Sequence, residues 1–236
     1  MRGTAACLLT ILANAASAQE LVGIPTITDG DTVVIGQTKI RLLDMDAPET
    51  DQFCFAKEGK GWNCGIDARE ALKKRVKEQE WHCQGSQLDR YGRLLASCMV
   101  GGENISSWMV RAGWAMSPIQ KGYSHRFDKD ERAAREGSMG LWAGAFIAPW
   151  DWRRRDCKTE ILGSVSIPID AHDKLCGSPS KPPDPNCTIK ATLRKDQCIF
   201  HREGGRYYGK IKMDGPNKRW FCSELEAEAA GCRSAR

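Results

Sequence analysis

The sequence predicts an α+β fold, in which short strands form one barrel-like sheet and helices lie around it. Short strand-like runs broken by turn residues fill residues 21–44, and two more lie around 79–84 and 93–100. Three segments with helical spacing of apolar residues follow or interrupt them, at 65–78, 103–114 and 127–137. An OB-type barrel is one architecture that combines these elements.

The strand runs within 21–44 read LVGIPTIT, TVVIG and KIRLLD, and the later two are joined by the turn region QGSQLDRYG. In the first helical segment, Ile66, Leu72 and Val76 form a rough apolar stripe. In the second, the apolar positions are Ile105, Trp108, Met109 and Ala112. The third ends at a pair of glycines, as helices commonly do.

The pattern changes after Trp142. An arginine run at 153–155 is followed by SPSKPPDPN at 178–186, an extended, Pro-rich stretch that indicates a boundary. We therefore expect a main domain at 21–143, a linker at 144–186 and a small α+β module at 187–236. The module holds 11 Lys and Arg against six Asp and Glu, which favours polyanions but also suits a solvated surface.

The N-terminus predicts a signal peptide. A single positive charge at Arg2 precedes an apolar run at 5–16, and Ala16-Ser17-Ala18 suits cleavage before Gln19. The run is too short for a membrane-spanning helix, and no later segment is apolar enough for one. A periplasmic or secreted protein after cleavage of residues 1–18 is therefore expected. The alternative is a disordered or cytoplasmic N-terminal helix.

The chain has 11 cysteines, and removing Cys7 with the signal peptide leaves an even number. In an exported chain this predicts up to five disulfides. Local spacing suggests Cys54–Cys64, Cys83–Cys98 and Cys157–Cys176, and leaves Cys187, Cys198, Cys222 and Cys232 for the module, although sequence alone does not fix connectivity. A zinc site is the alternative, but the chain contains no C-x-x-C pair.

A first motif of chemical interest joins DGDTV at 29–33 to IRLLDMDAPET at 40–50. Calcium prefers several carboxylate and carbonyl oxygens, and Asp31, Asp46 and the carbonyl of Ala47 could supply three. Glu49 follows on the same loop and could orient or deprotonate a water. Taken singly, each residue also has an ordinary structural interpretation, such as a turn carboxylate or a rim charge.

A second motif, DRYGRLLA at 89–96, places Arg90 and Arg93 where they could contact phosphate. Arginine suits this role because its planar fork binds phosphate oxygens in pairs. Carboxylates and arginines together can bind metal, activate water and neutralise charge at a phosphodiester. The combined pattern therefore favours phosphodiester chemistry more strongly than any single residue does.

The motifs DGDT, IRLLDMDAPET, DRYGRLLA, MVRAGWA and GLWA resemble the staphylococcal nuclease (thermonuclease) family over about residues 22–143. The resemblance implies a five-stranded OB-fold barrel with three helices and Ca²⁺-dependent cleavage of DNA or RNA to 3′-phosphate products. It implies catalytic roles for Arg41, Glu49 and Arg93 and substrate contacts for Arg90 and Tyr91. It also implies calcium ligands from Asp31, Asp46 and Ala47.

The sequence departs from the family pattern after GWA, where MSPIQKGYS replaces tyrosines that pack on the nucleotide. Only Tyr123 is nearby as a substrate contact, so weaker stacking on the nucleotide base is expected. The module resembles small C-terminal modules of some bacterial family members, and related modules look like the metal-binding domain of the Ada repair protein. Because HREGG stands where a metal-binding cysteine would be expected, a disulfide-bonded module is favoured over a zinc site.

Two functional classes remain open at this point. The first is an active exported nuclease, acting as a monomer on nucleic acid without membrane insertion. The second is a catalytically weak nuclease-fold protein that binds nucleic acid or an envelope or exopolysaccharide partner. Both arginines and all three acidic residues of the motifs are present, which favours the active enzyme.

Overall fold

The computed structural model describes residues 19–118, 124–156, 158–167, 174–175, 180–194, 197–213 and 217–235. The expected signal peptide, Tyr123 and the expected Cys157–Cys176 pair therefore lie outside the described residues. No helix in the described ranges has the length and apolar character needed to cross a bilayer.

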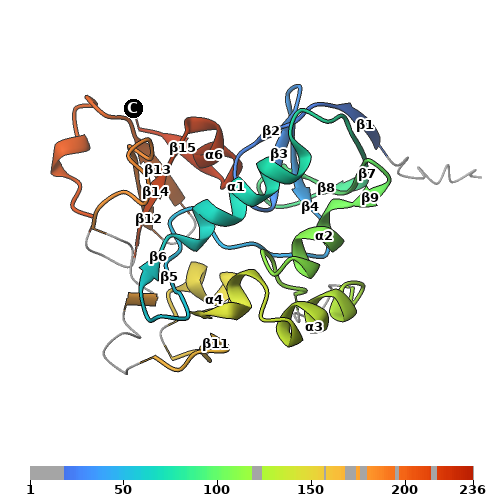
Figure 1. Ribbon diagram of the computed structural model, residues 1–236. Helices are drawn as coiled ribbons and strands as arrows, with labels where there is room; N and C mark the ends of the chain where they lie inside the picture. Colours follow the sequence, from blue (N-terminus) through green and yellow to red (C-terminus); the bar gives the residue numbers. More distant parts are fainter. Residues whose placement is uncertain are drawn as a thin grey trace, which may run out of the picture.

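The main sheet is mixed and curled, and its strand order is β1-β7-β8-β4-β3-β2, with β9 paired to β8 (Figure 1). The pairings are antiparallel except for β4 with β8, which are parallel. Its five longer strands are β1 (Gln19–Gly23), β3 (Thr32–Ile35), β4 (Thr38–Leu42), β7 (Trp81–Leu88) and β8 (Leu94–Val100). The two-residue strands β2 (Thr26–Ile27) and β9 (Glu103–Asn104) complete it. The predicted α+β fold with a barrel-like sheet is confirmed.

The three predicted helices are present as α1 (Cys64–Val76), α2 (Ile105–Arg111) and α3 (Asp128–Glu136). The apolar stripe predicted for α1 is buried, since Leu72 and Val76 are fully inaccessible. They pack with Ile40, Trp81 and Met109 in the core beneath the curled sheet. The apolar spacing along the sequence therefore identified the faces that form this core.

The segment expected as a linker contains regular structure. It holds β10 (Ala145–Phe146), α4 (Pro149–Arg154) and β11 (Leu162–Gly163), preceded by the 3₁₀ turn η1 (Gly140–Ala143). Strand β10 pairs with β5 (Cys54–Phe55), which also pairs with β6 (Gly61–Trp62). Trp152 of α4 is fully buried, so this segment packs against the main domain and positions the arginines of α4.

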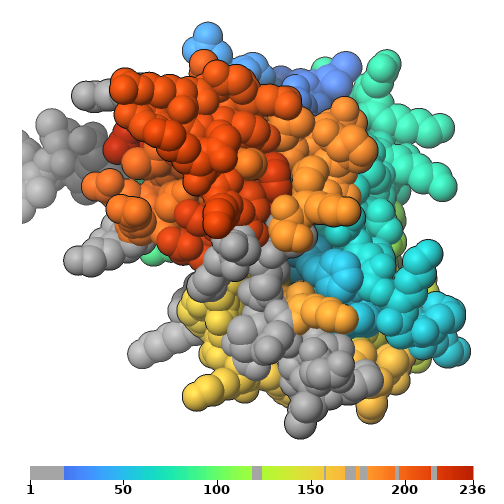
Figure 2. Space-filling view, turned by 90° about the vertical axis from the view of Figure 1, so that its left-hand side faces the viewer, coloured from blue at the N-terminus to red at the C-terminus, as the bar shows by residue number. Residues whose placement is uncertain are grey.

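The C-terminal module is a four-stranded sheet of order β14-β12-β13-β15. Its elements are β12 (Ile189–Arg194), β13 (Gln197–His201), η3 (Tyr208–Lys210), β14 (Lys218–Phe221), α6 (Glu224–Ala229) and β15 (Cys232–Ser234). Buried Phe200 and Phe221 lie in its own small core. Figure 1 shows the module beside the main domain, to the left of α1, and Figure 2 shows it covering much of one face.

Four disulfides cross-link the described residues. Two of them, Cys54–Cys64 and Cys83–Cys98, confirm the local pairings suggested by the sequence. The other two, Cys187–Cys222 and Cys198–Cys232, lie within the module. Within the described ranges, no group of three or more His, Cys, Asp or Glu is arranged to hold a metal. The two disulfides of the module confirm the expected disulfide bonding of Cys187, Cys198, Cys222 and Cys232.

Candidate active site

The loop before β3 is shaped by a carboxylate turn. Asp29 Oδ1 accepts hydrogen bonds from the backbone N–H groups of Asp31 (3.0 Å) and Thr32 (2.6 Å). These hydrogen bonds give Asp29 an ordinary structural role in a turn, which presents Asp31 at the start of the strand. Burial, reinforced by the charges of Asp31 and Glu49, raises the pKa of Asp29 well above its usual value.

Arg41 on β4 lies between two of the predicted site carboxylates. Its Nη1 is 2.8 Å from Asp31 Oδ2, and its Nη2 is 2.9 Å from Asp46 Oδ1. The strand register pairs Arg41 with Thr32, next to Asp31, while backbone hydrogen bonds with Met116 fix Asp46. The two carboxylates therefore converge on one guanidinium, and both are nearly inaccessible.

Ala47 lies against the turn that carries Asp31. Its backbone N–H donates to Asp31 Oδ2 at 3.4 Å. A Cβ atom added at Gly30 would lie 2.7 Å from the Ala47 methyl, so only glycine allows this close approach. The close approach brings the loop with Asp46 and the turn with Asp31 together.

Glu49 is held by two arginines from outside the motif that contains it. Arg153 Nη1 of α4 is 3.1 Å from Glu49 Oε1, and Arg219 Nη2 of β14 is 2.5 Å from Glu49 Oε2. Burial alone would raise the pKa of Glu49, but the charges of Arg219 and Arg153 outweigh burial and lower it to about 2. Glu49 is therefore ionised, with both carboxylate oxygens occupied.

The second motif joins the first through Thr32. Asp89 accepts from the backbone N–H groups of Tyr91 and Arg93, and its Oδ2 is 2.7 Å from Arg93 Nη2. Arg93 Nη1 donates to Thr32 Oγ1 at 3.2 Å, and that hydroxyl donates to Asp31 Oδ1 at 2.8 Å. Arg93 is therefore linked to the carboxylate pair through the Thr32 hydroxyl.

Arg90 and Tyr91 lie further out. The Arg90 guanidinium carbon is 4.8 Å from the centre of the Tyr91 ring, and that of Arg93 is 5.4 Å from it. Tyr91 is 43% exposed, so part of its ring remains available to another molecule. The structure thus gathers the predicted residues around the loops of β3, β4 and the β7–β8 turn, apart from Tyr123.

Arg153 and Arg219 were not predicted from the sequence as site residues. Arg153 stands in the arginine run after Trp142, which marked a change of pattern but carried no role. Arg219 stands in KRWF of the module, 170 residues after its partner Glu49. Only the packing of α4 and the module onto the main domain reveals that both arginines reach these carboxylates.

The cluster contains carboxylate oxygens, the kind of ligand that hard cations prefer. Asp31 and Asp46 are each paired with the Arg41 guanidinium, which lies between them. In the structure Arg153 contacts both Asp46 oxygens, at 2.8 and 2.5 Å. These contacts lower the pKa of Asp46 even though burial alone would raise it. A metal ion at Asp46 would therefore compete directly with Arg153.

The curled mixed sheet carries DGDT at the start of β3 and DRYGRLLA at the turn from β7 to β8. The family described as "Staphylococcal nuclease homologue" matches residues 39–144. The chain belongs to this family, as its similarity to known nucleases also shows.

Three relatives illustrate the similarity. The chain is 33% identical to the micrococcal nuclease of Shigella flexneri, over 65% of this chain and 92% of that protein. It is 31% identical to an uncharacterized endonuclease of Escherichia coli O157:H7, over 55% and 82% respectively. It is 26% identical to the succinoglycan biosynthesis protein ExoI of Rhizobium meliloti, over 59% and 74%.

Proposed function

We propose that this chain is a calcium-dependent nuclease that hydrolyses DNA or RNA to 3′-phosphate products. The observation that carries the proposal is the shared Arg41 guanidinium, which holds Asp31 and Asp46 together beside Glu49. Two nearby carboxylates suit a hard cation, while arginine suits a phosphate. Family membership supports the reaction class.

In the proposed reaction a water oxygen bonds to phosphorus while the P–O5′ bond breaks, and the 5′ oxygen takes up a proton from solvent water and leaves as a hydroxyl. Glu49 accepts the proton of the attacking water. Arg41 and Arg93 neutralise charge on the phosphate oxygens. Asp31, Asp46 and the Ala47 carbonyl would hold calcium, which supplies Lewis-acid polarisation of the phosphate when bound. Arg90, Tyr91 and Tyr123 would contact the substrate.

We further propose that the protein acts in the periplasm or outside the cell, as a monomer. Disulfides persist in oxidising compartments, and four are present among the described residues. They are consistent with the cleavable signal peptide proposed for residues 1–18.

Calcium should be required for cleavage. Purified protein is expected to degrade labelled single-stranded DNA or RNA with calcium and to stop when EDTA is added, because the carboxylate pair alone supplies no Lewis acid. The measurement is the initial rate across a calcium titration, with magnesium as the comparison ion. Cleavage that continues unchanged in EDTA would contradict the proposed cofactor.

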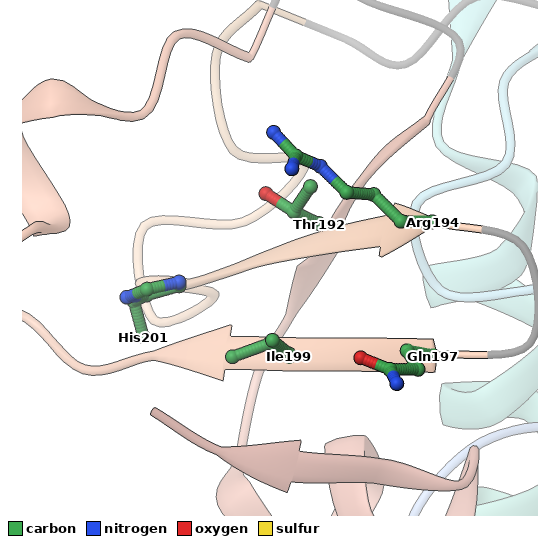
Figure 3. Close-up of a pocket in the computed structure, with 5 residues that line it drawn as sticks. All are labelled: Thr192, Arg194, Gln197, Ile199 and His201. Atoms are coloured by element: carbon green, nitrogen blue, oxygen red, sulfur yellow. The ribbon is translucent and has the colours of Figure 1, made fainter. Parts of the chain in front are cut away.

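A basic face of the module favours a second candidate function, the binding of a polyanion without cleavage. Strand register places Lys190, Thr192 and Arg194 on the same face as Gln197, Ile199 and His201. Five of these residues, all but Lys190, line a shallow pocket of about 190 Å³ (Figure 3). Because the described residues of the module's strands include no Asp or Glu, their charge suits nucleic acid or an acidic polysaccharide.

Arg194→Glu tests this face. In EDTA, the variant is expected to bind fluorescent oligothymidine more weakly than wild type, with a smaller dependence of log Kd on log salt, because phosphate contacts release counterions. Arg132→Glu on α3 makes the same charge change on an exposed helix elsewhere. If both variants bind equally, only net charge matters and the face has no specific role. The measurement is fluorescence anisotropy between low and physiological salt.

A further inference from the structure

The module touches the main domain at residues that adjoin Glu49 in the sequence. Thr50 Oγ1 donates to Glu226 Oε1, and Asp51 Oδ2 accepts the Trp220 N–H at 3.2 Å. All four residues are buried. Strand β14 and helix α6 therefore dock directly on the loop that carries Glu49.

Two contacts extend this interface across the site. Lys39 Nζ on β4 is 3.4 Å from Glu228 Oε2 on α6. On the other motif, a Cβ atom added at Gly231 would lie 2.3 Å from Cδ1 of Tyr91, so the module packs against that ring. The docked module therefore contacts both the strand that carries Arg41 and the turn that carries Arg93.

Arg219 is the residue that the module delivers to the site. Its side chain is 9% exposed, lies beside Phe221 at 4.6 Å from guanidinium carbon to ring centre, and ends on Glu49. Its Nε is also 3.6 Å from Asp51 Oδ1. Burying an arginine is costly without carboxylate partners, so this side chain depends on the docked arrangement.

In the docked arrangement the proposed catalytic side chains are largely buried. Side-chain exposures are 13% for Arg41 and Glu49 and 9% for Arg93. A polymer phosphate must contact these groups directly, and an attacking water must reach a Glu49 oxygen. Both Glu49 oxygens are already paired with Arg153 and Arg219.

We propose that the C-terminal module is an autoinhibitory cap, which closes the nuclease site by docking Arg219 on Glu49 and covering the phosphate-binding residues. The inference rests on the proposed nuclease function. Nucleic acid reaches the site when the module undocks from the Glu49 loop.

Cutting the connection in the folded protein tests the cap. A protease recognition sequence inserted at exposed Ser180–Lys181 allows cleavage after the disulfides have formed. No described disulfide joins the two sides of this cut. Size exclusion then separates the module from the main domain, and each is assayed for oligothymidine binding in EDTA and for cleavage with calcium.

We expect the separated main domain to bind oligothymidine at least about tenfold more tightly than the uncut chain and to cleave it faster by a similar factor. In the uncut chain, Arg219→Ala should give the same direction of change. Arg202→Ala is the matched control, because Arg202 pairs with Glu224 within the module and is 59% exposed. This control should behave as wild type.

The outcomes separate the cap from the nuclease proposal. Tighter binding without cleavage by any form would refute the nuclease function and retain the cap. Equal binding before and after separation would overturn the cap. Slower cleavage by both the separated domain and Arg219→Ala would also overturn it, since Arg219 would then assist the reaction.

Discussion

Replacing Glu49 with glutamine is expected to lower kcat by about 10²–10⁴-fold, because glutamine keeps the shape of the side chain but cannot accept a proton from water. The Glu49 backbone is positioned by the main domain itself: a Cβ atom at Gly65 would lie 1.7 Å from the Glu49 carbonyl oxygen, so α1 packs tightly against this backbone. The measurement is kcat on single-stranded DNA with saturating calcium, in the uncut and cut chains.

Glu70→Gln on α1 is the matched control for this change. Glu70 pairs with Lys73 on the helix surface and is 49% exposed. Its replacement should leave kcat unchanged, and circular dichroism should show both variants folded. A Glu49→Gln enzyme within a few-fold of wild type would assign the proton transfer to another group.

Arg41→Ala is expected to remove both activity and much of the stability. Asp31 and Asp46 would remain buried without the guanidinium between them. Breaking a buried ion pair by removing one partner costs about 3–5 kcal/mol. Urea unfolding at neutral pH measures the loss, and calcium should restore part of it by replacing the missing positive charge.

Two companion variants sharpen this prediction. Arg75→Ala removes an arginine whose pairing with Glu103 is about one-third exposed, so the expected loss is at most about 1 kcal/mol. Arg41→Lys keeps the positive charge but loses the planar guanidinium that binds two partners. Compared with Arg41→Ala, it should therefore regain more stability than activity. Equal stability of Arg41→Ala and Arg75→Ala would show that the carboxylates do not depend on Arg41.

Sequence patterns predicted the elements that depend on local periodicity. The stripe containing Leu72 and Val76 identified α1 because a helix buries the same face every few residues. The Cys83–Cys98 disulfide could also be predicted from local sequence, because the two residues lie directly opposite each other in strands joined by one turn. Asp31, Arg41 and Asp46 were grouped correctly because short turns connect their strands.

The rest of the site depends on packing between distant segments. Arg153 and Arg219 occur in polar stretches where surface arginine is ordinary, and no spacing links either residue to Glu49. The register of β14 against β12 and the docking of α4 determine their direction. The segment 144–186 looked like a linker because its regular structure also depends on distant residues. Its strand β10 forms by pairing with β5. The assignment of the catalytic and calcium-binding roles, and of domain boundaries, stays a prediction.

The Cys54–Cys64 cross-link makes the geometry of the site depend on the redox state of the compartment in which the protein folds. It closes the loop between the Glu49 segment and the first residue of α1, the helix that supports the Glu49 backbone. Disulfides of this kind do not persist in a reducing cytoplasm. A newly made chain there would lack this brace, and the loop that carries Glu49 would be held less firmly against α1. The geometry of the site would then be completed only where the disulfide can form.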